Sequence, residues 1–130
     1  MEIPKILYVD YEIINLELFQ LTFMNVFQVL VAESAEEGLK LLALNSDIHV
    51  VIADLKMPGM NGMDFIKEAK KMNQERVCML LTGFMEPNIM MEGLNKELIF
   101  RYIMKPWKKD ALMEAIQQAM VRRNGSNSIS

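Results

Sequence analysis

The chain has 130 residues, of which 52% are hydrophobic and 24% are charged, and its formal net charge is −3. This length predicts one domain with a sizeable buried core, and the composition excludes an intrinsically disordered chain. The net charge gives no general attraction to nucleic acid or anionic lipid, and the apolar runs are too short to span a bilayer, so we expect a cytoplasmic protein that binds neither DNA nor a membrane.

Five short apolar runs alternate with longer helical patterns, an order typical of an α/β protein with a parallel sheet. The runs cover residues 6–9, 27–32, 48–53, 77–81 and 99–104. Gln28 and Arg101 interrupt the second and fifth runs, which is typical of edge strands, whereas the other three runs are almost unbroken and suit strands covered on both faces. The sequence therefore predicts a flavodoxin-like, doubly wound, five-stranded parallel sheet of order 2-1-3-4-5 with five helices.

The helical patterns differ in how clearly they define one buried face. Segment 12–25 is apolar on more than one side, and two interpretations are open: it is the most enclosed helix, or it offers a surface to a partner. Ser34 and Glu37 have the spacing of a capping box and predict a helix over residues 34–45. An apolar stripe at helical spacing over residues 112–119 predicts the last helix.

Four polar residues stand at or just past the carboxyl ends of separate apolar runs, where ligands bind in open parallel sheets. They are Asp10, Asp54, Thr82 and Lys105. This set suits phosphoryl chemistry on a carboxylate, with Asp54 as the nucleophile and Asp10 as a ligand of Mg²⁺. Lys105 and the Thr82 hydroxyl would bind oxygens of the phosphoryl group.

The sequence around these residues resembles the receiver domain of bacterial two-component response regulators, a CheY-like domain, over residues 5–123. The motifs that carry the resemblance are ILYVD at 6–10, VIAD at 51–54, MPGMNG at 57–62, LLTG at 80–83 and YIMKPW at 102–107. We therefore expect a receiver domain over residues 1–123. The small polar residues 124–130 would form a flexible tail or the start of a linker.

The resemblance implies a role for each matched residue. Asp54 corresponds to the acceptor of a phosphoryl group from a sensor histidine kinase or a phosphotransfer protein, and the main-chain carbonyl of Lys56 to a further Mg²⁺ ligand. Thr82 and Tyr102 correspond to a coupled switch pair, and Lys105 to a phosphate contact followed by a cis peptide bond to Pro106. The family also implies a partner or homodimer contact on the face of the fourth helix, fifth strand and fifth helix.

One residue departs from the family pattern. The family usually has two consecutive acids after the first strand, and here the second position is Tyr11. A phenol is neutral at pH 7 and supplies no carboxylate charge to Mg²⁺, and Glu12 is the nearest acid that could replace it. Two functions follow: a phosphorylatable switch with weakened Mg²⁺ binding, or a pseudo-receiver that acts as a phosphorylation-independent protein-interaction module.

We expect a signalling domain and not an enzyme, with at most Mg²⁺-dependent self-phosphorylation and autodephosphorylation. Phosphatases of the haloacid-dehalogenase class also use an Asp nucleophile, but they need a second Asp two positions later, where this chain has Lys56. A flavodoxin would need a phosphate-binding loop after the first strand, and residues 10–15 offer none. The single histidine, His49, is expected to have a structural role.

Overall fold

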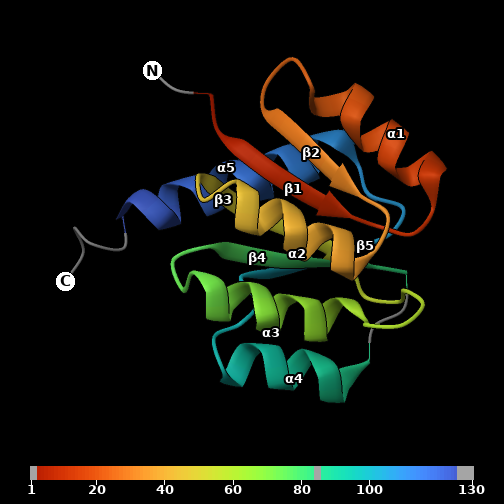
Figure 1. Cartoon of the computed structure of the whole chain (residues 1–130), viewed down its shortest axis with the longest axis vertical. Helices are drawn as coiled ribbons and strands as arrows, with labels where there is room; N and C mark the ends of the chain where they lie inside the picture. The colour runs from red at the N-terminus through yellow and green to blue at the C-terminus, as the bar shows by residue number, and fades with distance from the viewer. Residues whose placement is uncertain (1–2, 84–85, 126–130) are drawn as a thin grey trace.

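The computed structural model describes residues 3–83 and 86–125 (Figure 1). Its elements are β1 (Lys5–Val9), α1 (Ile13–Phe23), β2 (Gln28–Ala32), α2 (Ala35–Leu44), β3 (Ile48–Asp54), α3 (Gly62–Met72), β4 (Val77–Thr82), α4 (Pro87–Asn95), β5 (Arg101–Met104) and α5 (Lys109–Gly125). None of the described helices is long and apolar enough to cross a membrane. Helix α5 continues through residue 125, and residues 126–130 of the predicted tail lie outside the described residues.

The five strands form one parallel sheet of order β2-β1-β3-β4-β5, which confirms the predicted flavodoxin-like topology. The two interrupted runs are the edge strands, as predicted. Strand β3 ends at Asp54 and β4 at Thr82, one residue later than the apolar runs indicated. These two polar side chains are therefore part of the sheet, and the ladder of main-chain hydrogen bonds holds them in place.

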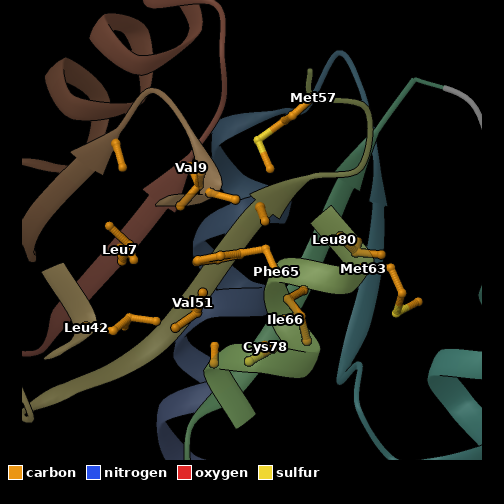
Figure 2. Packing of buried hydrophobic residues seen from close by; sticks show 14 of the residues in the cluster. Leu7, Val9, Leu42, Val51, Met57, Met63, Phe65, Ile66, Cys78 and Leu80 are labelled. Atoms are coloured by element: carbon orange, nitrogen blue, oxygen red, sulfur yellow. The ribbon is translucent and has the colours of Figure 1, made fainter. Parts of the chain in front are cut away.

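Helices cover both faces of the sheet, and each face has its own buried core. On one face α2 and α3 pack on the inward side chains of the central strands, with Leu42, Phe65 and Ile66 meeting Leu7 and Val51 (Figure 2). On the other face α1 and α5 cover the alternate strand residues, and there the side chains of α1 and α5 bury Ile6, Tyr8, Ile52 and Met79.

Helix α1 buries one side and exposes an equally apolar other side. Leu16, Phe19 and Phe23 are buried against the sheet, whereas Ile14 is 78% and Leu21 71% exposed. The interpretation that α1 is the most enclosed helix is therefore wrong. Its apolar residues recur on both sides of the helix, so the sequence pattern could not tell the covered face from the open one.

The predicted capping box of α2 forms in a modified way. The Ser34 hydroxyl accepts a hydrogen bond from the Glu37 amide at 3.1 Å, which satisfies one free amide of the first turn. The Glu37 carboxylate accepts from the amide of Glu33, and not from that of Ser34 as in the standard motif. The helix itself spans Ala35–Leu44, with Ser34 and Asn45 as its caps.

Arg76, just before β4, is buried and joins three segments at the amino-terminal edge of the sheet. Its guanidinium donates to the carbonyl oxygens of Ile48 (3.1 Å), Leu42 (3.2 Å) and Asn45 (3.3 Å). These carbonyls lie at the end of α2 and the start of β3. The rigid fork of donors of an arginine suits this arrangement, because a single side chain satisfies several main-chain acceptors at once.

We expect Arg76→Met to lower the free energy of unfolding by about 2–4 kcal/mol, because buried carbonyl oxygens lose their donor. Urea unfolding followed by circular dichroism measures the change. Lys71→Met is the matched control: Lys71 is exposed, and its ion pair with Glu68 is at the surface, so a change within about 0.5 kcal/mol is expected. A loss for Arg76→Met no larger than this control would show that the guanidinium contributes little to stability.

Candidate functional site

Four polar residues lie together at the carboxyl edge of the sheet. Asp54 and Thr82 end β3 and β4, and Asp10 and Lys105 directly follow β1 and β5. Asp10, Asp54 and Thr82 are buried, and the Lys105 side chain is 20% exposed. The Lys105 amide donates to the Thr82 carbonyl oxygen at 2.8 Å, and the Asp10 amide to that of Ala32 at 3.1 Å. Main-chain hydrogen bonds of the sheet thus fix the backbone positions of Asp10 and Lys105.

Lys105 connects the two carboxylates. Its Nζ lies 2.9 Å from Asp10 Oδ2 and 3.4 Å from Asp54 Oδ2. Burial raises the pKa of Asp54; the charge of Lys105 opposes this shift, and the charge of Asp10 adds to it. Burial alone would lower the pKa of Lys105, but the hydrogen bond and charge of Asp10 and the charge of Asp54 outweigh it, so the pKa is raised. Lys105 is therefore a fixed cation at neutral pH.

Asp10 is surrounded by hydrogen-bond donors from three further groups. Its Oδ2 accepts from the Tyr8 hydroxyl at 2.5 Å and from Asn15 Nδ2 at 3.1 Å, in addition to Lys105, and its Oδ1 accepts from the Glu12 amide at 3.0 Å. Burial, and then the hydrogen bond and charge of Asp10, raise the pKa of Tyr8 far above its usual value. The Tyr8 hydroxyl is thus a permanent donor to this carboxylate.

Tyr8 and Asn15 were not identified by the sequence analysis. Tyr8 precedes Asp10 by two residues on a strand, so both side chains point to the same face, which is a signal that the sequence did contain. Asn15 lies in the first turn of the helix that follows, where its amide reaches back to Asp10. Neither contact could be predicted without knowing that α1 covers this face.

The turn after Asp54 is built by residues of the MPGMNG motif. Gly59 has a φ of 76°, a left-handed conformation that favours glycine. A Cβ at Gly62 would overlap the carbonyl oxygen of Asp54, so only glycine lets the start of α3 approach the end of β3 this closely. Asn61 caps α3, since its side chain accepts from the Asp64 amide at 2.8 Å. The chain can therefore reverse within a few residues of Asp54.

Tyr11 lies at the edge of the site. It is 48% exposed and lines a groove of about 550 Å³ with Lys56, Met57, Ile89 and neighbouring residues. The main chain of Lys56 donates a hydrogen bond to the Asp54 carboxylate, so Lys56 lies beside Asp54. Glu12 is exposed and its carboxylate accepts from Asn15, so in this structure it does not take the place of the missing acid.

The donor set at this edge fits Mg²⁺, with one carboxylate fewer than the usual pattern. Within residues 3–83 and 86–125, no three His, Cys, Asp or Glu side chains form a group that could hold a metal ion. Asp10 and Asp54 are the two carboxylates present. Magnesium sites typically use one or two carboxylates and complete their coordination with water and phosphate oxygens. Two carboxylates are therefore within the number that a magnesium site uses.

Tyr102 connects this edge of the sheet to α4. Its hydroxyl lies 3.1 Å from the carbonyl oxygen of Ile89 and 3.0 Å from that of Met90, both accepting. A Cβ at Gly93 would overlap this hydroxyl and also approach Ile99, so the glycine makes the contact possible. The ring thus lies against the backbone of α4. In the chain, Tyr102 precedes Lys105 by three residues. The Lys105–Pro106 peptide bond is cis, as the resemblance implied.

Comparisons with known proteins agree with this geometry. The family model of the response regulator receiver domain matches residues 6–117. The hydrogenase transcriptional regulatory protein HoxA of Cupriavidus necator is 33% identical over 115 residues, which are 88% of this chain and 24% of that protein. A CheY homolog of Campylobacter jejuni is 29% identical over 77% of this chain and 78% of its own length.

A solved response regulator receiver domain protein from Clostridium thermocellum superimposes with a TM-score of 0.87 at 34% identity, covering 94% of this chain and 98% of that one. The chain spans about a quarter of the length of the HoxA relatives. The likeness thus concerns one domain of those regulators. The sheet order matches the predicted topology, and Asp10, Asp54 and Lys105 lie together at one edge of the sheet. Because the family model also matches, the chain belongs to the response regulator receiver domain family.

Proposed function

We propose that this domain accepts a phosphoryl group on Asp54 from a histidine kinase or a phosphotransfer protein and thereby changes its affinity for a partner. The observation that carries the proposal is the position of Asp54 at the end of a central strand, 3.4 Å from the ammonium of Lys105. Receiver domains interact with such kinases and carriers, and the receiver family model matches residues 6–117 of this chain.

The chemistry follows from the site. A carboxylate oxygen of Asp54 forms a bond to phosphorus while the bond from phosphorus to the donor's nitrogen breaks, and the electron pair leaves with the donor imidazole. The ammonium of Lys105 is positioned to offset the charge that the phosphoryl oxygens bring. The Thr82 hydroxyl lies at the end of the neighbouring strand β4 and would donate to one of these oxygens.

Receiver domains generally bind Mg²⁺ in an acidic pocket. In this chain Asp10, Asp54 and the main-chain carbonyl of Lys56 would hold the ion, which when bound would neutralise oxygens of the transferring group. Tyr11 occupies the place of a further acid and supplies no charge. We propose that Mg²⁺ binding is weaker than it would be with an acid at this position.

A second function, a pseudo-receiver that binds partners without phosphorylation, is favoured by the same tyrosine. Asp10, Asp54 and Lys105 together leave the resting site with one uncompensated negative charge, one fewer than with an acid at position 11, so the site attracts a metal ion less strongly. The domain would then present a constant surface to its partner. The Mg²⁺ experiments below separate the two functions.

Phosphorylation would reach the surface through Thr82 and Tyr102. Movement of the Thr82 hydroxyl toward a phosphoryl oxygen would change the space beside β5. The Tyr102 ring lies against α4 at Gly93 and would change its position in that space. The face of α4, β5 and α5 carries exposed apolar side chains on each element, namely Met91, Leu94, Met104 and Val121. We propose this face for the switched partner or a homodimer.

The remaining assignments follow from the domain's character. We propose that residues 1–123 form the receiver. The domain would act in the cytoplasm, where its kinase partners present their phosphohistidine, and it would make no direct contact with nucleic acid because its net charge is −3.

Asp54→Asn should abolish phosphorylation. Incubation of the wild type with a small phosphodonor and Mg²⁺ should add one phosphate, detected by intact mass spectrometry, because one carboxylate acts as the nucleophile. Asp64→Asn is the matched control, since Asp64 is an exposed acid on α3 and should leave the labelling unchanged. Labelling that persists in Asp54→Asn would place the acceptor elsewhere.

Tyr11→Asp should raise the affinity for Mg²⁺ by about ten- to a hundredfold, equivalent to about 1.4–2.8 kcal/mol, because it adds a charge beside the ion. A Mg²⁺ titration followed by NMR measures it. Tyr11→Asn is the matched control, because it removes the ring without adding charge. Equal gains in both variants would assign the effect to the ring, and binding in neither Tyr11→Asp nor the wild type would favour the pseudo-receiver.

Arg101→Glu should weaken self-association or partner binding through the α4, β5 and α5 face. The Arg101 guanidinium contacts Gln118 of α5 and lies 5.7 Å from the centre of the Phe100 ring, so reversal of its charge changes this face directly. Light scattering measures the association. Lys40→Glu, the same charge change on the distant helix α2, is the control. An unchanged association constant in Arg101→Glu would move the interface elsewhere, with the apolar side of α1 as the next candidate.

A further inference from the structure

The two oxygens of the Asp10 carboxylate are held unequally. Its Oδ2 accepts from three side chains, Tyr8, Asn15 and Lys105, at 2.5, 3.1 and 2.9 Å. Its Oδ1 accepts from one main-chain amide, that of Glu12, at 3.0 Å. A carboxylate oxygen has about two acceptor positions, so Oδ2 is fully used and Oδ1 keeps one position for a cation.

The two neutral donors are themselves fixed. Tyr8 is fully buried, and its ring stacks on Phe19 of α1 with centroids 4.5 Å apart and planes 27° from parallel. A hydroxyl on such a ring has little freedom, and a donor at 2.5 Å from an ionised carboxylate is at the short end of the range for charge-assisted hydrogen bonds. Asn15 lies in the first turn of α1, and its amide is also bonded to Glu12.

We infer that Tyr8 and Asn15 are positioning residues that orient Asp10 so that its Oδ1 would be able to hold Mg²⁺. This inference rests on the metal site of the proposed function and deepens it. With Tyr11 in place of an acid, the site depends more on the placement of the single remaining acid after β1. Donors that orient a ligating carboxylate commonly affect metal affinity by ten- to a hundredfold when they are removed.

The distinction between Mg²⁺ and Ca²⁺ gives a sensitive test. Magnesium requires near-ideal octahedral geometry at short distances, whereas Ca²⁺ accepts varied geometry and coordination number. A carboxylate that loses its fixed orientation should therefore lose affinity for Mg²⁺ more than for Ca²⁺. A general loss of folded protein would lower the apparent affinity for both ions by the same factor.

The experiment compares four variants with the wild type, each freed of metal with a chelator and titrated with Mg²⁺ and with Ca²⁺ by NMR. Tyr8→Phe should weaken Mg²⁺ binding about tenfold, and Ca²⁺ binding less. Asn15→Ala, at a partly exposed position that does not endanger folding, should show the same preference with a smaller loss. Asp10→Asn should remove Mg²⁺ binding. Lys71→Met, at an exposed position near the carboxyl end of α3, where the chain returns to the opposite edge of the sheet, should bind as the wild type does.

The outcomes separate this inference from the function on which it rests. The positioning role would be overturned if Tyr8→Phe and Asn15→Ala both bound Mg²⁺ as the wild type does, or if they lost affinity for Mg²⁺ and Ca²⁺ equally. In that case, loss of Mg²⁺ binding in Asp10→Asn would still support the metal site. Wild-type affinity in Asp10→Asn would overturn the metal site itself, and the positioning role with it. Selective loss of Mg²⁺ in Tyr8→Phe, with binding absent in Asp10→Asn, would support both.

Discussion

Two buried carboxylates share one edge of this sheet because the ammonium of Lys105 lies between them. Without that cation, nothing would oppose the effect of burial and of the Asp10 charge, which both raise the pKa of Asp54. The contacts at 2.9 and 3.4 Å hold Asp10 and Asp54 near a common point. The ammonium offsets one of the two negative charges, so the close approach of the two carboxylates depends on one side chain.

The rest of the fold keeps these three charges in register. Parallel pairing brings the ends of β1, β3 and β5 to one edge, and the main-chain bond from Lys105 to Thr82 fixes the start of the lysine side chain. Close packing supplies the remaining precision. Gly62 allows α3 to begin directly against Asp54, and Gly62 and Asp54 are close to each other in the chain. The geometry of the site is thus a property of the sheet and its shortest turns.

The sheet and most of the site could be predicted from the sequence, because central parallel strands are apolar on both sides and their ends are marked by polar residues. Gln28 and Arg101 identified the edge strands for the same reason. What the sequence could not provide was the orientation of elements with no dominant polar side. The pattern of α1 is apolar on more than one side, so the open face at Ile14 and Leu21 required the tertiary structure.

The buried guanidinium of Arg76 also shapes how the molecule opens. Because it satisfies carbonyls of Leu42, Asn45 and Ile48, fraying at the end of α2 or the start of β3 would strand a cation among apolar groups. We therefore expect these segments and the start of β4 to exchange their amide hydrogens as one cooperative unit. At the edge of the sheet opposite Asp54, one side chain thus couples the opening of a helix end to that of two strand starts.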